Sequence, residues 1–145
     1  MVYGWKLDGN QEVDLVLCSF NMAKKTIQRL IGYIPKNIIF HQDQGSQFTS
    51  YRYVDIVLKN KIILSYSTPG TPTDNPGQES FFGRLKDECQ DEFNEAKNIK
   101  QLKKILKRRI NYYNKKRIHT SIQYKSPERY TINFIKNISL NYCSK

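Results

Sequence analysis

The chain has 145 residues, a length that fits a single domain of ordinary size. Apolar residues make up 39% and charged residues 26% of it, which excludes an intrinsically disordered chain. No run approaches the roughly 20 apolar residues of a membrane span, and no signal-peptide pattern opens the chain, so we expect a cytoplasmic protein without membrane attachment. Cys18, Cys89 and Cys143 are odd in number and lack CxxC spacing, which argues against a disulfide framework and a zinc site.

The predicted elements at the start of the chain are a strand, a helix and a second strand. The short apolar segment Val2 to Leu7 is typical of a strand. Asn10 is placed to cap a helix whose apolar residues recur at helical spacing, and Cys18 on that apolar face is expected in the core. The β-branched run Asn37 to Phe40 indicates a buried strand, with Asp43 just beyond its carboxyl end.

The middle of the chain is predicted to hold another helix and strand, followed by a loop. The helix begins at Thr49 or Ser50 and continues to about Lys59, and the strand covers Ile62 to Ser67. Turn-forming residues from Thr68 to Asp74 predict a mobile loop. This loop leads into the next helix.

That helix is expected to begin at Asn75 and Pro76, because proline is tolerated at the first helical position, where its missing N–H has no partner to lose. Glu79 therefore belongs to the first helical turn. A separate helix from about Lys97 to Asn114 is expected to bury its apolar residues, Ile99 among them, and a Ser-Pro-Glu sequence opens a last helix.

The net charge of +11 is concentrated in one part of the chain. Between Lys97 and Arg117 there are ten basic residues and no acidic one, which is typical of a phosphate-binding surface. The DNA-binding candidates are Lys86, Lys103, Lys104, Lys107, Arg108 and Arg117. The alternative is a solvated helix face, which we favour less because no i,i+4 acids balance the bases and because Tyr112 and Tyr113 interleave with them.

Two acidic residues stand in specific sequence blocks, with 35 residues between them. Asp43 lies in His41-Gln42-Asp43-Gln44-Gly45-Ser46-Gln47-Phe48-Thr49-Ser50, and Glu79 lies in Asp74-Asn75-Pro76-Gly77-Gln78-Glu79-Ser80-Phe81-Phe82-Gly83. Both blocks resemble those of the second and third catalytic acids in DDE transposases and retroviral-type integrases. The nearest group is the bacterial insertion-sequence transposases of the OrfB type. Two carboxylates without such blocks would be read as surface residues.

The resemblance extends through nearly the whole chain. Ser65-Tyr66-Ser67-Thr68-Pro69-Gly70-Thr71-Pro72 resembles the serine-rich segment of the family. The residues that resemble its closing signature are Tyr112-Tyr113-Asn114, Arg117, His119, Tyr124, Ser126-Pro127 and Tyr130. Pro76 is a departure, because relatives commonly have Ala there. The family's first catalytic Asp lies before the segment that matches, so we expect an amino-terminally truncated member.

The resemblance implies an α/β, ribonuclease-H-like integrase core that is incomplete at its amino-terminal strands and has extra carboxyl-terminal helices. Residues 1–95 would be the partial catalytic core, and residues 96–145 a basic helical extension of the same domain. Asp43 and Glu79 would be catalytic residues and would bind Mg²⁺ or Mn²⁺, whose preferred ligands are oxygens. The implied partner is DNA, both transposon ends and target. With one acid absent we expect weak metal binding and no autonomous activity. With the opening strands absent we expect an unpaired strand edge and therefore self-association or instability.

Five supporting residues have two interpretations each. They are His41, Gly45, Asp74, Asn75 and His119. At the end of its strand, His41 is at least as well explained by a hydrogen bond as by metal ligation, and Gly45 is better explained by the backbone than by a ligand contact. Asp74 or Asn75 is expected to orient the helix of Glu79 by capping. His119 is expected to hydrogen-bond the neighbouring backbone, with a phosphate contact as the second interpretation.

Three functional hypotheses share this family resemblance. The first is an active recombinase completed by an Asp from elsewhere. The second is a non-catalytic DNA-binding or interfering fragment, which the basic helix permits. The third is a vestigial product of a truncated insertion element with no selected function. As a bacterial protein of this kind, the chain is expected in the cytoplasm, associated with the nucleoid.

Overall fold

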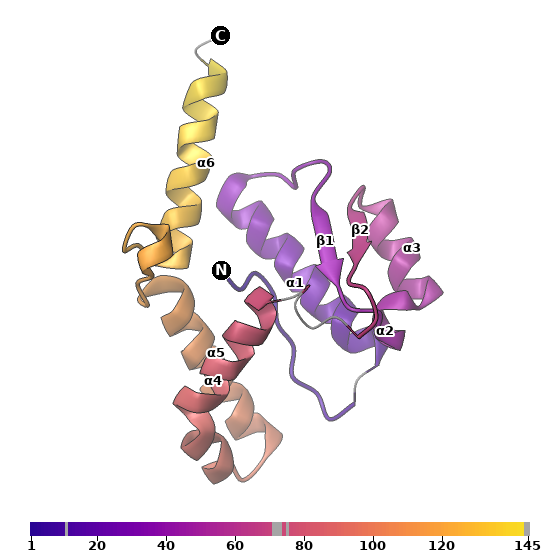
Figure 1. Cartoon of the computed structure of the whole chain (residues 1–145), viewed down its shortest axis with the longest axis vertical. Helices are drawn as coiled ribbons and strands as arrows, with labels where there is room; N and C mark the ends of the chain where they lie inside the picture. Colours follow the sequence, from indigo (N-terminus) through magenta and orange to yellow (C-terminus); the bar gives the residue numbers. More distant parts are fainter. Residues whose placement is uncertain (11, 71–73, 75, 144–145) are drawn as a thin grey trace.

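A computed structural model describes residues 1–10, 12–70, 74 and 76–143, with side chains for all of these except 136 and 138–143. In chain order the elements are α1 (Val13–Ile31), β1 (Ile39–Gln42), α2 (Ser46–Thr49), α3 (Tyr51–Lys59), β2 (Ile63–Tyr66), α4 (Pro76–Glu95), α5 (Ile99–Lys115), the 3₁₀ turn η2 (Thr120–Ile122) and α6 (Pro127–Cys143). The strands with α1, α2 and α3 form one side of the molecule, and α4, α5 and α6 form the other (Figure 1). The predicted α/β class is confirmed.

Strands β1 and β2 form a parallel pair in which His41 lies opposite Ser65. Parallel neighbours need a crossover connection, and α2 with α3 provides it. The core between the sheet and the helices consists of Val16, Leu17, Phe20, Tyr53, Val57 and Ile62. The hydroxyl of buried Tyr53 donates to Gln42 Oε1 at 2.7 Å, and burial raises the pKa of Tyr53 to about 12. This bond fixes the last residue of β1, next to Asp43.

The prediction of a strand at Val2 to Leu7 is wrong, because this segment lies against two helices and not beside a strand of the described residues. Asn114 on α5 hydrogen-bonds the backbone of Val2. At Gly4 a Cβ atom would lie 2.1 Å from the carbonyl oxygen of Ser19, so the backbone lies directly against α1. These contacts leave the segment without a strand neighbour.

Two predictions about α1 also need correction. Its N-cap is Glu12, and the amide of Asn10 donates to the Glu12 carboxylate at 3.4 Å instead of capping the helix. Cys18 is exposed, because the core face of the helix is centred on Leu17 and Phe20 and turns residue 18 toward solvent.

The expectation that β1 is buried holds for only one of its faces. Phe40 packs on Phe20 with a centroid separation of 5.5 Å, whereas Ile39 on the opposite face is 63% exposed. At α3 the predicted start is confirmed, because Ser50 is the N-cap and its side chain accepts the N–H of Tyr53. Helix α2 was not predicted.

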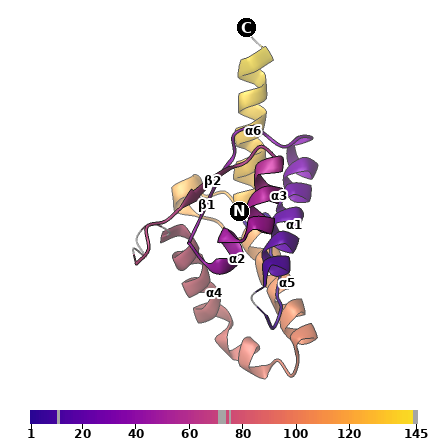
Figure 2. The same ribbon diagram turned by 90° about the vertical axis from the view of Figure 1, so that its right-hand side faces the viewer.

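Helices α4 and α5 form a hairpin, and α6 continues beyond it, away from the rest of the molecule in both views (Figures 1 and 2). The Asn98 side chain caps α5 by accepting the N–H of Gln101. Ile99, expected to be buried, is 51% exposed, because it begins α5 at the tip of the hairpin. Glu128 of α6 forms a 3.7 Å ion pair with Arg29 of α1. In the part of the chain that is described, every helix is too short or too polar to cross a membrane.

Candidate functional site

Helix α4 separates two hollows, because its side chains alternate between two faces with helical periodicity. We call the first hollow the carboxylate cleft. It is lined by Asp43 and Gln44 after β1 and by Glu79, Phe82, Gly83 and Lys86 of α4. We call the second the arginine cavity. Its lining includes Arg84 and Glu88 of α4, Arg109 and Tyr113 of α5, and Arg117 and His119 beyond α5.

The carboxylate cleft has a volume of about 650 Å³ and contains both predicted catalytic acids. Asp43 Oδ1 accepts the N–H of Gly45 at 2.8 Å. A Cβ atom at Gly45 would lie 2.9 Å from the same oxygen, although the φ of −56° suits any residue. A side chain at residue 45 would therefore displace the Asp43 carboxylate from this position.

The loops that follow the two strands are joined by hydrogen bonds at the edge of the cleft. The N–H of Ser67 donates to the carbonyl of Gln42 at 2.9 Å, and the amide of Gln44 donates to the carbonyl of Ser67 at 3.2 Å. Asp74 accepts the N–H of Thr68 at 3.0 Å, so it holds the loop immediately before α4. Asn75, predicted to cap the helix, and residues 71–73, predicted as part of a mobile loop, lie outside the described residues.

The cleft carries two carboxylates, the type of side chain that binds divalent metals. Asp43 and Glu79 are exposed carboxylates of the kind that Mg²⁺ prefers, and Glu79 lies in the first turn of α4, where the helix dipole favours negative charge. Within the described residues, no three or more His, Cys, Asp or Glu side chains are grouped closely enough to hold a metal. His41 does not line the cleft; its Nδ1 lies 2.9 Å from Ser65 Oγ across the sheet.

The DNA-binding candidates fall into two groups. Lys86 lines the cleft. Three lysines of α5 are exposed and form no ion pair with the described residues, namely Lys103, Lys104 and Lys107. Arg108, in contrast, pairs with Glu92, and Arg117 pairs with Glu88. The basic segment has no i,i+4 acids, as expected, but acids of α4 balance its arginines.

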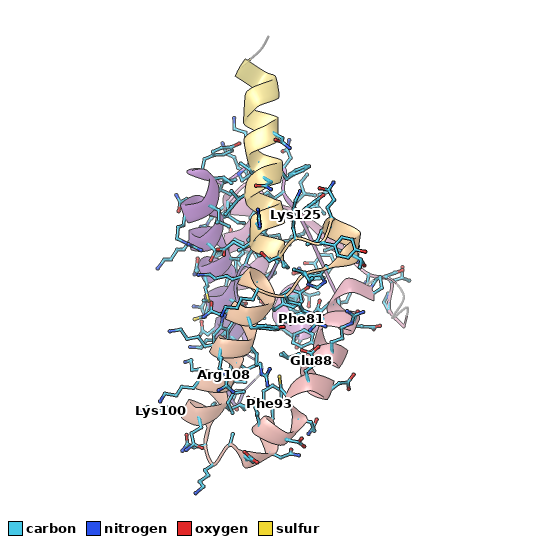
Figure 3. All side chains as sticks on the ribbon, turned by 90° about the vertical axis from the view of Figure 1, so that its left-hand side faces the viewer. Phe81, Glu88, Phe93, Lys100, Arg108 and Lys125 are labelled. Carbon is cyan, nitrogen blue, oxygen red and sulfur yellow. The ribbon has the colours of Figure 1, made fainter. Side chains whose placement is uncertain are left out.

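The balancing acids come from α4, which reasoning from i,i+4 spacing within one helix could not find. Figure 3 shows Glu88 between α4 and α5 and Lys100 directed away from both. Glu92 lies between two arginines, and the guanidinium of Arg109, followed by that of Arg108, holds the pKa of its carboxyl below the usual value. The acidic stretch of α4 and the basic stretch of α5 are thus two sides of one helix interface.

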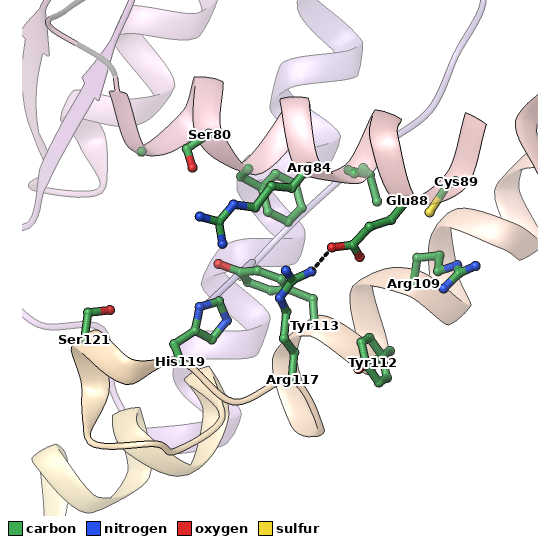
Figure 4. Close-up of a pocket in the computed structure, with 13 residues that line it drawn as sticks. Ser80, Arg84, Glu88, Cys89, Arg109, Tyr112, Tyr113, Arg117, His119 and Ser121 are labelled. Carbon is green, nitrogen blue, oxygen red and sulfur yellow. Dashed lines mark hydrogen bonds and ion pairs between the residues drawn. The ribbon is translucent and has the colours of Figure 1, made fainter.

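The arginine cavity has a volume of about 240 Å³ and an aromatic floor. The ring of Tyr113 meets Phe81 with a centroid separation of 4.9 Å and His119 with one of 5.2 Å. Figure 4 shows Arg84, Arg117 and His119 converging on this ring from different elements. Burial, followed by the charges of Arg117, Arg84 and the amino terminus, lowers the pKa of His119.

The side chain of His119 was expected to hydrogen-bond the neighbouring backbone, and the structure differs from this expectation at Nε2. Its Nε2 is buried without a hydrogen-bond partner among the described residues. The residue is held instead through its main chain, which pairs with Lys125 and accepts the N–H of Tyr124. Ring packing on Tyr113 fixes the side chain.

Residues 60–127 match the Integrase core domain family. The chain is 33% identical to the transposase of insertion sequence IS904 from Lactococcus lactis, over 88% of its own length and 48% of that protein. It is 39% identical to the putative IS150 transposase InsK of Escherichia coli, over 76% of its length and 38% of that protein. The chain belongs to the insertion-sequence transposases of the OrfB type.

A transposase-like protein of Haemophilus influenzae extends this relationship, with 38% identity over 75% of the chain and 49% of that protein. Thus the chain spans about half the length of the curated transposases that it matches. Its fold is that of the catalytic core of BIV integrase, with a TM-score of 0.59 and 18% identity over 94% of this chain and 80% of that one. The ribonuclease-H-like fold expected from the sequence is therefore confirmed. Glu79 lies inside the matched integrase segment, and Asp43 precedes it.

Proposed function

We propose that the carboxylate cleft is the metal-binding part of a site for DNA strand cleavage and joining, which serves DNA transposition. The observation that carries this proposal is that Asp43 and Glu79, each in a family-like block, line the same cleft. Bound Mg²⁺ or Mn²⁺ would polarise the oxygens of the scissile phosphate. Family membership supports DNA as the substrate.

The charges in the cleft explain why a cation is needed. Two exposed carboxylates repel a DNA phosphate, and among the described residues that line the cleft Lys86 is the only basic one. In this proposal Gly45 holds the Asp43 carboxylate through its N–H, and Lys86 binds a phosphate next to the reacting one. Phe82, which is 48% exposed between Glu79 and Lys86, offers a flat surface to the substrate.

We also propose that this chain alone binds the metal weakly and does not join strands. Two-metal sites need ligands that bridge and flank both ions, and the described residues bring only two carboxylates to the cleft. A third acid from another segment or another chain would complete the site. Loss of either acid should then remove what metal binding the chain has.

The test is a chimera in which the matching segment of the Escherichia coli IS150 transposase is replaced by this chain. We expect transposition in cells, its loss in Asp43→Asn and Glu79→Gln, and its retention in Asp91→Asn and Glu95→Gln, which alter exposed acids of α4 outside the cleft. Transposition by the Asp43→Asn chimera would refute the assignment.

A measurement on the chain itself keeps the proposal testable if the chimera does not fold. Free Mn²⁺ is measured by electron paramagnetic resonance during titration of the purified chain. Weak binding that Asp43→Asn and Glu79→Gln each reduce is the expected result. Binding unchanged in both variants would contradict a role of the cleft in holding metal.

The second candidate function is DNA binding without chemistry, and the exposed lysines 103, 104 and 107 of α5 favour it. These lysines take no part in the ion pairs between the helices, so their charges are available to bind phosphates. A chimera that folds and binds DNA but stays inactive in every variant would support this candidate over the first.

A further inference from the structure

The arginine cavity contains three polar groups without a partner among the described residues, namely the exposed guanidinium of Arg84 and the buried atoms His119 Nε2 and Arg109 Nε. The guanidinium of Arg84 forms no hydrogen bond or ion pair among the described residues. The Nε2 atom of His119 is buried without a hydrogen-bond partner there. Both are directed into the cavity (Figure 4). Buried polar atoms are normally paired, so an unpaired one at a cavity wall indicates a missing partner.

The charge balance of the cavity indicates that this partner is an anion. Glu88 pairs with Arg117, and the single carboxylate of Glu92 is shared by Arg108 and Arg109. The positive charge of Arg84 is left over. The positive charges of Arg117 and Arg84 also act on His119. Burial is the largest cause that lowers the pKa of His119, and these two charges lower it further.

We propose that the arginine cavity binds a phosphate group, held by Arg84 and Arg117 and by the Nε2–H of neutral His119. Guanidinium groups bind phosphate through paired N–H donors, and a neutral imidazole with its proton on Nε2 adds a third donor. The hydroxyls of Ser80 and Ser121 also line the cavity and supply further donors. A volume of about 240 Å³ accommodates one phosphate group.

This site is separate from the carboxylate cleft, because Arg84 and Glu79 lie on different faces of α4. The proposal therefore stands whether or not the cleft holds metal. Two sources of phosphate have the required chemistry, the backbone of bound DNA and a free phosphate compound. The experiment separates them.

Inorganic phosphate is titrated into the purified full chain at constant ionic strength, with chloride as the balancing anion, and the ring signals of His119 are followed by NMR. We expect a saturable shift and a rise of about one pH unit in the pKa of His119, since a nearby negative charge favours the imidazolium. An absence of saturation, or an equal effect of chloride alone, would overturn the proposal.

The variant Arg84→Gln tests the proposal at its main residue, and it leaves the Arg117–Glu88 ion pair in place. Loss of a charge-assisted hydrogen bond should weaken phosphate binding about tenfold or more. The matched control is Arg129→Gln, which removes an exposed arginine of α6 outside the cavity and should bind as the wild type does. Equal affinities for Arg84→Gln and wild type would refute the site.

The last arm adds a duplex oligonucleotide to the phosphate-saturated chain. Displacement of phosphate, seen as the return of the His119 signals, identifies the DNA backbone as the source. If inorganic phosphate and the duplex bind at the same time, the ligand of the cavity is a free phosphate compound. Because inorganic phosphate is the probe throughout, failure of DNA cleavage by the carboxylate cleft does not affect the result.

Discussion

The side-chain amide of Asn114 forms two hydrogen bonds with the backbone of Val2. Its Oδ1 accepts the Val2 N–H at 2.8 Å, and its Nδ2 donates to the Val2 carbonyl at 2.8 Å, across 112 positions of sequence. Asn114 is buried on α5. The asparagine of the family's closing signature therefore has a structural task here, which is to hold the first residues of the chain on α5.

Replacing Asn114 by Ala should lower the free energy of unfolding by about 1–3 kcal/mol, because the part-buried N–H and carbonyl of Val2 lose their partners. Urea unfolding measures the change. Asn111→Ala, on the exposed face of the same helix, is the control and should stay within about 0.5 kcal/mol of wild type. A similar stability for both variants would contradict the structural role of Asn114.

This pair also shows what could be predicted from the sequence and what could not. Helices α1, α3, α4 and α5 follow from apolar periodicity and local caps such as Ser50, because both signals lie within a few residues. The hydrogen bonds of Asn114 join residues far apart in sequence. No local pattern indicates them, and the apolar segment at Val2 was misread as a strand for that reason.

The candidate site also has residues that could be predicted from the sequence and pairings that could not. Asp43, Glu79 and Lys86 were found through sequence blocks and spacing, and the fold places them along one cleft. The pairing of Arg108 with Glu92 and of Arg117 with Glu88 depends on how α4 packs on α5, so it could not be read from either helix alone. The arginine cavity was missed because its residues come from α4, α5 and η2.

Gly45→Ala should preserve folding but weaken metal binding in the carboxylate cleft. The added Cβ would lie 2.9 Å from Asp43 Oδ1 and 2.6 Å from Gln47 Nε2, both ends of movable side chains, so the Asp43 carboxylate is displaced at little cost in stability. Titration with Mn²⁺ measures binding, and thermal unfolding measures stability. Gly9→Ala, whose Cβ meets nothing within 4 Å, is the control. Unchanged Mn²⁺ affinity in Gly45→Ala would show that Asp43 does not depend on this contact.

Removing the exposed lysines of α5 should make DNA binding weaker and less sensitive to salt. Each lysine that neutralises a phosphate contributes about 0.9 to the slope of log affinity against log salt. Changing Lys103, Lys104 and Lys107 together to Gln should therefore flatten the slope by up to about 2.7, equally for unrelated duplexes. Fluorescence anisotropy at several salt concentrations measures it.

A matched triple replacement provides the control for this prediction. Lys6, Lys25 and Lys36 are exposed and lie outside α5, so changing them to Gln removes the same net charge from other surfaces. If both triple variants reduce the slope of log affinity against log salt equally, DNA binding depends on the overall charge of the chain and not on α5.

The pKa of His119 predicts a pH dependence of stability. Burial first, and then Arg117 and Arg84, lower this pKa in the folded chain below the ordinary 6.5. The unfolded chain therefore takes up a proton at a higher pH than the folded chain does. The contribution of His119 to stability is complete above about pH 6.5 and is lost as the pH falls through the folded-state pKa.

His119→Gln removes this titration, so its free energy of unfolding should fall less than that of the wild type between about pH 7.5 and about pH 5.5, the window around the ordinary histidine pKa. Arg84→Gln should show an intermediate slope, because it removes one of the charges that lower the pKa of His119. Urea unfolding at each pH measures the slopes, and comparison between variants cancels the groups that all of them share. A steeper slope in His119→Gln than in the wild type would reverse the assigned sign, and identical slopes in all three proteins would show that the positive charges around the arginine cavity do not act on His119.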